Sequence, residues 1–445
     1  MATGSSQAPA QTESAPSSAQ TQKERLFPWV KPYYSDPLTL TSGKGVWVKD
    51  DTGREYLDFF AGILTTSVGH CNEAVIARVE DQMRRLGHTS ALYITENQLE
   101  VAETLISLAP DGLTRAAFTN SGTEANETAI MAAQLFTGRS EVVALRYAYS
   151  GRSILATNLS AHAGWRPLPT SVAGICHARS PYVYRSPLGP DATEEDQVNF
   201  FIDDLVETIE TTTSGRPAAL IVEPIQGVGG FVVPPPGYLN RAAEVIRSYG
   251  GLFVCDEVQT AFGRTGERWF ACEHDSVDPD IMVMAKGIAN GFPVGAVLAR
   301  AEIADAWTAN SISTYGGNPI SMAAASATLD VMQAEDTPGR SSVRGAQVRR
   351  AFLTLADKYE WIGDVRGKGL MQAMEIVTDR RTREPDPGRA LAVLEAARAA
   401  GVLVGVGGLH GHVVRVGPSM LVTEEETAEA LSRLEHACEI AASQD

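Results

Sequence analysis

Three short, unbroken runs of apolar residues in the middle of the chain constrain its fold more than any other feature. They occupy residues 217–222, 252–255 and 281–285, and polar residues or glycines bound each of them. A run without alternation is typical of a strand buried on both faces, and such strands belong to parallel sheets covered by helices. Residues 239–248, between the first two runs, carry a helical pattern. We therefore predict an α/β fold with a mostly parallel sheet.

An ionisable residue follows each of the three runs at once: Glu223, Asp256 and Lys286. Open α/β sheets bind ligands outside the carboxyl ends of their strands, so these side chains mark a candidate site. Lys286 stands apart, because the chain has 37 lysines and arginines but only seven lysines, and no other lysine lies between positions 49 and 358. A desolvated lysine can lose its proton near neutral pH and then attack a carbonyl. We interpret Lys286 as a Schiff-base lysine, with a solvated loop lysine as the alternative.

A loop of small residues opens a helix at positions 118–126, which read FTNSGTEAN. The first N–H groups of a helix are unpaired and carry the positive end of its dipole, which suits a phosphate. Ser121 and Thr123 can add hydroxyl donors, and ordinary helix capping is the alternative. A phosphate site, a carboxylate and a lysine are the groups that pyridoxal 5'-phosphate requires from a protein. The sequence therefore favours this cofactor.

Composition excludes several classes of partner. The net charge of −17 argues against nucleic acid and against anionic membranes, because both would repel the chain. No uncharged apolar run approaches the ~20 residues that span a bilayer. The five cysteines include no C-x-x-C pair, so we expect no metal site, no disulfides and a reducing compartment. The first 22 residues contain no basic residue, which is unlike a secretory or mitochondrial leader, and we expect a cytoplasmic protein.

The N-terminal part of the chain divides into a tail and an ordered segment. The start of the chain is low in complexity and in bulky apolar residues, and we expect a disordered tail over residues 1–25. Residues 38–60 alternate apolar and polar side chains around two glycine turns, which predicts a β-meander. Residues 73–86 carry an amphipathic helix.

The pattern changes again after residue 335. Helices are expected over 344–358 and 389–400, with a strand over 371–376, a hairpin of 402–406 with 412–416, and a last helix starting at Thr423 with Glu426 in a capping box. We place a large domain at residues 76–334. A smaller α+β domain would combine residues 26–75 with residues 335–445.

A series of short motifs follows in a fixed order. They are YLD at 56–58, GHC at 69–71, NSGTEAN at 120–126, EPIQG at 223–227, DEVQT at 256–260, AKG at 285–287, TYGGNP at 314–319 and VRGKGLM at 365–371. In this order they resemble the class III aminotransferases, which are pyridoxal-phosphate enzymes of fold type I. The runs GILTTSVGHC at 62–71 and RVGPSM at 415–420 are most similar to the alanine–glyoxylate aminotransferase 2 subgroup.

The resemblance implies roles around the cofactor ring. Lys286 would bind the cofactor as a Schiff base and later move a proton between substrate and cofactor. Asp256 would pair with the pyridinium nitrogen. Tyr149 and Val258 would pack on opposite faces of the ring, and Gln259 would reach its phenolic oxygen.

The resemblance also implies how phosphate and substrate are held. Ser121, Gly122 and Thr123 would hold the phosphate. Thr314 would add a phosphate contact from a neighbouring subunit, which implies at least a homodimer. Arg415 would receive a substrate carboxylate in a bidentate pair.

Two positions depart from the family pattern. Ser150 follows Tyr149 where a histidine is frequent, and Val228 stands where users of 2-oxoglutarate commonly carry a glutamate. We therefore expect an aminotransferase that moves an amino group from alanine, β-alanine or an ω-amino acid to a small 2-oxo acid such as pyruvate or glyoxylate. The alternatives are a racemase, aminomutase or decarboxylase on the same scaffold, an ω-amine or 4-aminobutyrate transaminase, and a binding protein that uses the phosphate site alone.

Overall fold

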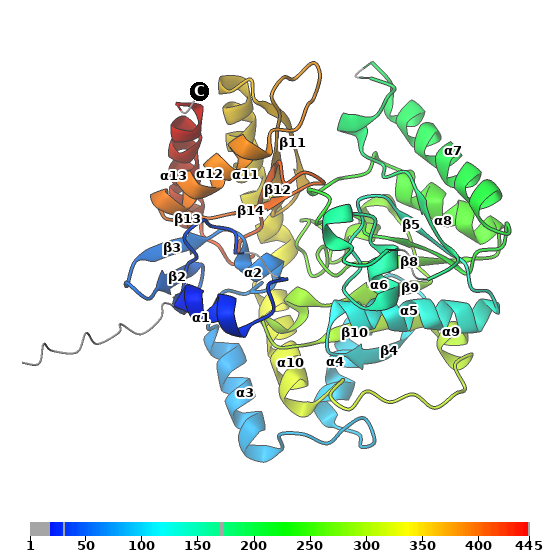
Figure 1. Ribbon diagram of the computed structural model, residues 1–445. Coiled ribbons are helices and arrows are strands. Elements are labelled where there is room, and N and C mark those ends of the chain that lie inside the picture. The colour runs from blue at the N-terminus through cyan, green and yellow to red at the C-terminus, as the bar shows by residue number, and fades with distance from the viewer. Residues whose placement is uncertain (1–17, 30–31, 170–171, 190, 444–445) are drawn as a thin grey trace, which may run out of the picture.

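The three apolar runs form neighbouring parallel strands of a seven-stranded sheet (Figure 1). The computed structural model describes residues 18–29, 32–169, 172–189 and 191–443. Every ladder from β9 to β6 is parallel, whereas β10 is antiparallel to both β9 and β4. In spatial order the strands are β4 (Leu113–Thr119), β10 (Gly295–Arg300), β9 (Ile281–Met284), β8 (Leu252–Asp256), β7 (Ala219–Val222), β5 (Val142–Leu145) and β6 (Ile175–Ala178). The predicted α/β fold with a mostly parallel sheet is confirmed.

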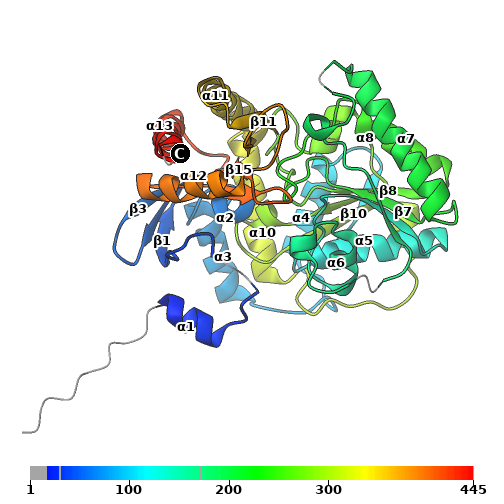
Figure 2. The same cartoon turned by 45° about the horizontal axis from the view of Figure 1, so that its top comes forward.

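The central strands are apolar, apart from Asp256 at the end of β8, because helices cover both faces of this sheet (Figure 2). In β8, Phe253 packs into the core on one face and Val254 into the core on the other. Helices α7 (Glu194–Thr212) and α8 (Tyr238–Ser248) contribute to the first core, and α5 (Gly122–Thr137) and α9 (Ala301–Asp305) to the second. Both faces of β8 are therefore shielded from water.

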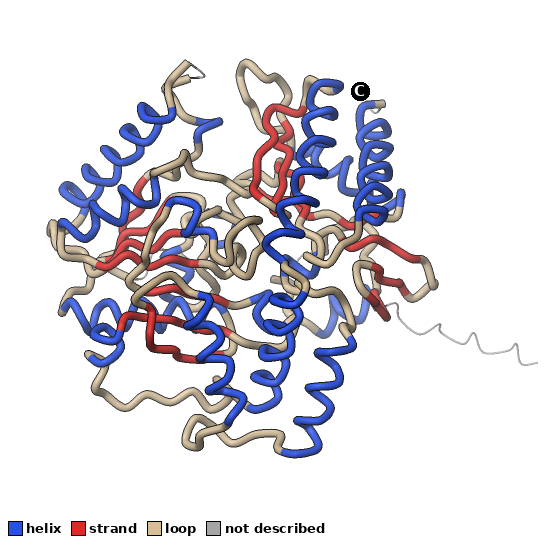
Figure 3. The backbone as a smooth tube through the Cα atoms, turned by 180° about the vertical axis from the view of Figure 1, so that it is seen from behind, coloured by secondary structure: helices blue, strands red, loops and turns tan. Residues whose placement is uncertain are grey.

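The two ends of the chain meet in a smaller sheet. Strands β1 (Leu40–Lys44), β2 (Trp47–Asp50) and β3 (Glu55–Asp58) form the expected meander, and β3 pairs in parallel with β13 (Val402–Leu403). A further sheet has the order β11-β12-β15-β14, from β11 (Ile362–Lys368), β12 (Met371–Ile376), β15 (Val413–Val416) and β14 (Gly405–Gly407). Figure 3 shows these strands lying apart from the large sheet. This pairing agrees with a unit built from both ends, and its boundaries stay a prediction.

Helices pack against these smaller sheets. They are α11 (Thr337–Lys358), α12 (Pro387–Ala400) and α13 (Glu424–Ala442), and Thr423 caps α13 through the expected capping box with Glu426. The remaining elements are α1 (Ser18–Arg25), α2 (Ala61–Leu64), α3 (Glu73–Arg85), α4 (Glu96–Leu108), α6 (Ile154–Leu159), α10 (Pro319–Ala334) and the 3₁₀ turns η1 (Ala163–Trp165), η2 (Val183–Arg185), η3 (Ala271–Asp275) and η4 (Lys286–Ala289).

Some local expectations differ from the structure. The expected hairpin is formed only by β14 and β15, because Val402–Leu403 pairs with β3 instead. Helix α11 begins at Thr337, several residues before the expected start. Of the expected tail, residues 1–17 lie outside the described residues, and Ser18–Arg25 form α1. No helix in the described part of the chain has the length and apolar character that a membrane span needs.

Candidate active site

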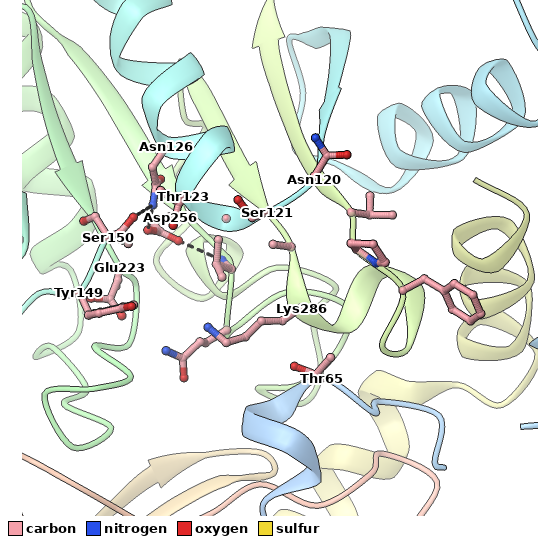
Figure 4. Close-up of a pocket in the computed structure, with 18 of the residues that line it drawn as sticks. Thr65, Asn120, Ser121, Thr123, Asn126, Tyr149, Ser150, Glu223, Asp256 and Lys286 are labelled. Carbon is pink, nitrogen blue, oxygen red and sulfur yellow. Dashed lines mark hydrogen bonds between the residues drawn. The ribbon is translucent and has the colours of Figure 1, made fainter. Parts of the chain in front are cut away.

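The carboxyl ends of β7, β8 and β9 place the three predicted ionisable groups around one cavity of about 290 Å³. Glu223 directly follows β7, Asp256 ends β8, and Lys286 opens the 3₁₀ turn after β9. In Figure 4 their side chains enter the same space from separate strands. Parallel strands end at the same edge of a sheet, which is why residues far apart in the sequence converge here.

Asp256 is held rigidly as a hydrogen-bond acceptor on the cavity wall. Its Oδ2 accepts from the Asn126 Nδ2, at 2.8 Å, and its Oδ1 accepts from the backbone N–H of Val258, at 3.1 Å. Burial raises the pKa of Asp256, while these hydrogen bonds and the charge of Lys286 act to lower it. A positively charged group placed against this carboxylate would stabilise its ionised form.

Lys286 presents its amine in conditions that favour the neutral form. Its backbone has φ +45°, a left-handed conformation that is uncommon for a residue with a side chain. Desolvation lowers the pKa of Lys286, and the charges of Asp256 and Glu223 oppose that shift. A neutral amine with a free electron pair is the form that attacks carbonyls and accepts protons.

Glu223 occupies a buried position between the sheet and the 226–232 loop. Its two carboxylate oxygens accept hydrogen bonds from the backbone N–H groups of Tyr149 and Gly227, each at 2.9 Å. Burial, followed by the charge of Asp256, raises the pKa of Glu223 to about 8. Burial next to Asp256 therefore favours the protonated form of this side chain in the folded chain.

The start of α5 forms one end of the cavity. The Ser121 side chain caps the helix by accepting from the N–H of Glu124, and Gly122 and Thr123 open the first turn. Their N–H groups have no intrahelical acceptor, which makes this end suitable for an anion. A Cβ on Gly122 would lie 3.2 Å from both methyl groups of Val258. A side chain at position 122 would therefore crowd Val258 at this corner of the cavity.

The predicted ring-contacting residues also line the cavity. Tyr149, Val258 and Gln259 are all in its wall. The Gln259 Oε1 is buried and has no hydrogen-bond partner among the described residues. Such an orphaned acceptor is costly unless a ligand supplies the donor. Gln259 lies tightly against Gly227, where a Cβ would come within 2.2 Å of its Nε2.

Two predicted site residues lie outside this cavity. Thr314 is exposed and lines a separate groove of about 880 Å³, which shares Asn120 and Thr123 with the cavity. Arg415 is buried behind the 226–232 loop. Its guanidinium donates to the carbonyls of Gly227, at 2.7 Å, and Val406, at 2.6 Å.

Sequence reasoning missed Asn126. Its amide donates to Asp256 and to the carbonyl of Ser150, at 2.9 Å, and its Oδ1 has no partner among the described residues. The signal was present, because Asn126 belongs to the NSGTEAN motif and lies one helical turn after Gly122. Thr65 and Phe292 also line the cavity. Thr65 lies within the run GILTTSVGHC at 62–71, but the sequence assigned a site role neither to it nor to Phe292.

One group of potential metal ligands exists in the described part of the chain, formed by Cys255, Glu257 and Cys272. The Glu257 carboxylate already accepts from the N–H of Cys272, at 2.8 Å, and from the hydroxyl of Thr260. Burial raises the pKa of the Cys255 thiol far above its ordinary value, which opposes the thiolate form that metals bind. These hydrogen bonds give the group a structural role.

These residues fit pyridoxal 5'-phosphate. The α5 terminus could hold its phosphate, Asp256 its ring nitrogen and Lys286 its aldehyde carbon. Gln259 and Asn126, each with a buried amide oxygen that has no partner among the described residues, line the same cavity. When bound, this cofactor acts as an electron sink for the bonds at the carbon that carries the substrate nitrogen. A mostly parallel sheet with this site defines a pyridoxal-phosphate enzyme of fold type I.

Comparison with known proteins gives the family. Residues 31–438 match the aminotransferase class-III family, to which the chain belongs, and it is a pyridoxal-phosphate-dependent aminotransferase. It is 39% identical to alanine–glyoxylate aminotransferase 2 homolog 2, mitochondrial, of Arabidopsis thaliana, over 91% of this chain and 83% of that protein. It is 36% identical to acetylornithine aminotransferase of Methanopyrus kandleri, over 90% of this chain and 94% of that protein.

A solved structure shows the same fold. An amine transaminase from an uncultivated Pseudomonas species, in its PLP-bound form, superposes with a TM-score of 0.87 at 33% identity, over 92% of this chain and 96% of that chain. The family and subgroup resemblances stated from the motifs are therefore confirmed. The comparisons do not favour a racemase, aminomutase or decarboxylase.

Proposed function

We propose that this aminotransferase transfers an amino group from a carboxylated donor, such as alanine, β-alanine or an ω-amino acid, to pyruvate or glyoxylate. The observation that carries the proposal is that Arg415 is buried without an acidic partner among the described residues. This guanidinium is 4% exposed, and no carboxylate in the described part of the chain forms an ion pair with it. A buried cation without an acidic partner is a strong site for a substrate carboxylate.

The surroundings of Arg415 support this role. The rings of Phe60 and Phe231 lie 5.1 Å and 5.3 Å from its guanidinium carbon and exclude water from it. Burial lowers the pKa of Arg415 from its usual value, and a carboxylate would counter that effect. Its Nε is buried without a partner among the described residues, so one donor is still free for an incoming acid.

Each site residue has a proposed role in this reaction. Lys286 Nζ binds the cofactor covalently and, once released by the substrate, moves a proton at the substrate carbon. Asp256 keeps the ring nitrogen protonated. Tyr149 and Val258 enclose the ring, and Gln259 donates its amide to the phenolic oxygen.

The phosphate has its own proposed contacts. The N–H groups of Gly122 and Thr123 and the hydroxyls of Ser121 and Thr123 bind it at the start of α5. Thr314 adds a contact across a homodimer interface. In support, Thr314 is exposed on a groove that continues past Asn120 and Thr123, and the neighbouring Ile312 and Tyr315 are 60% and 63% exposed.

Val228 is the proposed determinant of acceptor choice. It adjoins Gly227, whose carbonyl accepts from Arg415, and its own carbonyl accepts from Gly408 at 2.9 Å. A glutamate at this position would bring a carboxylate to Arg415, whereas valine leaves the guanidinium available for the acid of a small substrate. We therefore expect pyruvate and glyoxylate to be better acceptors than 2-oxoglutarate.

Single-turnover kinetics test this assignment. The enzyme is first converted to its amine form with alanine, and reoxidation by pyruvate, glyoxylate or 2-oxoglutarate is followed by absorbance. We expect both small acids to react faster, and Val228→Glu to slow both half-reactions with alanine and pyruvate. Val228→Ala is the matched control, because it changes the same side chain without adding a carboxylate. Val232 on the same loop is buried, so a glutamate there would not serve as a control. Faster reoxidation by 2-oxoglutarate in the unmodified enzyme would overturn the proposal.

Oligomeric state and location are proposals as well. Light scattering at micromolar concentration should give twice the chain mass of 47.5 kDa. Five free cysteines without a disulfide fit a reducing compartment, and we place the enzyme in the cytoplasm. The Arabidopsis relative carries "mitochondrial" in its name, so fractionation of cells that express the chain is the direct test.

A further inference from the structure

A second cavity, of about 400 Å³, concentrates positive charge in an acidic protein. It shares no lining residue with the active-site cavity. Arg349, Arg366 and Arg383 line it, and Asp364 is the one acidic residue among the described residues of its wall. The whole chain carries a net charge of −17, so three guanidinium groups around one hollow are unusual here. This cavity is called the arginine pocket below.

One of these arginines is already neutralised. Arg366 pairs through Nη1 with Asp364, at 2.8 Å, and with the buried Glu375, at 2.6 Å. Glu375 also pairs with Arg185, at 2.5 Å. The two arginines and two carboxylates of this network cancel in charge. Arg366 therefore shapes the wall without adding net charge to the pocket.

The other two arginines have no acidic partner. Arg349, on α11, makes no hydrogen bond or ion pair with any described residue, and it is only partly exposed. Arg383 donates to the backbone carbonyl of Tyr184 and lies 5.2 Å over the ring of the same tyrosine. Neither contact neutralises its charge. The pocket thus holds two uncompensated positive charges.

The walls suit a small ligand. Tyr182, Tyr184 and Gln197 come from the segment before and within α7, while Arg349 and Asp364 come from α11 and β11. The volume is within the range of pockets that hold small molecules. Guanidinium groups match the oxygens of phosphates through paired N–H donors.

We propose that the arginine pocket binds a small phosphate-bearing dianion, such as a phosphate monoester, at a site separate from the active site. Two uncompensated cations match the charge of such a dianion. The ligand would join the segment around η2 to α11 and β11. Binding to the folded chain alone stabilises it, so occupancy should raise the melting temperature.

Calorimetric titration of the cofactor-saturated enzyme tests this proposal, with inorganic phosphate as the probe and chloride at equal ionic strength as the comparator. The full chain is used after removal of free cofactor, so that the phosphate site on α5 is already filled. We expect one saturable phosphate site per chain. Each charge-assisted contact contributes about tenfold in affinity, so Arg349→Gln with Arg383→Gln should weaken binding about a hundredfold.

The chain offers a matched control. Arg350 and Arg381 are exposed neighbours of the two pocket arginines and do not line the cavity. Arg350→Gln with Arg381→Gln makes the same change in net charge and should leave phosphate affinity within about twofold. Equal weakening in both double variants would show general charge attraction and overturn the proposal.

Two further outcomes also bear on the assignment. Arg415→Gln should retain phosphate binding, because Arg415 does not line the arginine pocket. Loss of binding in that variant would place the phosphate at the substrate site and overturn the proposal. Absence of saturable binding in the unmodified enzyme would overturn it as well.

Discussion

Replacing Asn126 by alanine is expected to raise the pKa of Asp256 and to move the acid limb of the reaction to higher pH. The Asn126 amide is the one side-chain donor to this carboxylate among the described residues, at 2.8 Å. It lowers the pKa of Asp256 against the effect of burial. Without it, the ionised carboxylate keeps the backbone N–H of Val258 as its donor.

The size of the effect follows from the strength of the lost bond. A buried hydrogen bond to a charged group contributes about 1.5–3 kcal/mol, and one pKa unit corresponds to about 1.4 kcal/mol. The pKa of Asp256 should therefore rise by about one to two units. Because Asp256 must be ionised to hold a protonated ring nitrogen, activity is present above its pKa and is lost as the pH falls through it.

The assay is the pH profile of kcat/KM for alanine in the unmodified enzyme, Asn126→Ala and Asn120→Ala. Asn120 is the control, because its amide lines the same cavity but donates to Glu124 and Ser313 instead. The acid limb should move to higher pH only in Asn126→Ala, and retained cofactor absorbance shows that the variant is folded. An acid limb unchanged by Asn126→Ala, or shifted equally in both variants, would refute the reasoning.

Three further changes have defined outcomes. Arg415→Ala should raise the KM for alanine about a hundredfold, since the lost contact is a charge-assisted pair, and should leave the KM for an amine without a carboxylate nearly unchanged. An equal rise in KM for both substrates would show that Arg415 does not bind the substrate carboxylate. The cofactor-free chain should lose stability as the pH rises from about 4.5 to about 8, because folded Glu223 keeps its proton where the unfolded chain releases it. The free energy of unfolding, measured with urea, should therefore depend less on pH in Glu223→Gln than in the unmodified chain. An equal pH dependence in both chains would contradict the raised pKa. Gly122→Ala should weaken cofactor binding about tenfold, because the added Cβ would lie 3.2 Å from the Val258 methyl groups. Fluorescence titration measures the cofactor affinity, and an unchanged affinity would contradict this steric argument.

Those parts of the fold that follow from local sequence pattern could be predicted. Strands β7, β8 and β9 read clearly because both of their faces are buried, as Phe253 and Val254 show. The start of α5 at Ser121 and that of α13 at Thr423 follow from side-chain capping within a few residues. The positions of Asp256 and Lys286 at the sheet edge follow from the strands that carry them.

Features that depend on contacts between residues far apart in the chain could not be predicted from the sequence. Strand β10 runs antiparallel to both of its neighbours, β4 and β9, and nothing near residue 295 encodes that pairing. The Asn126–Asp256 bond joins residues 130 positions apart. The expected hairpin is only partly formed for the same reason, because Val402 pairs with β3 rather than with β15.

The central claim is that Lys286 holds pyridoxal 5'-phosphate covalently. The purified enzyme is saturated with the cofactor, reduced with borohydride, digested and mapped by mass spectrometry, with Lys286→Ala treated in parallel. We predict a phosphopyridoxyl group on the peptide that contains position 286 and on no peptide of the variant. Retention of the group on another lysine, or no modified peptide at all, would contradict the account.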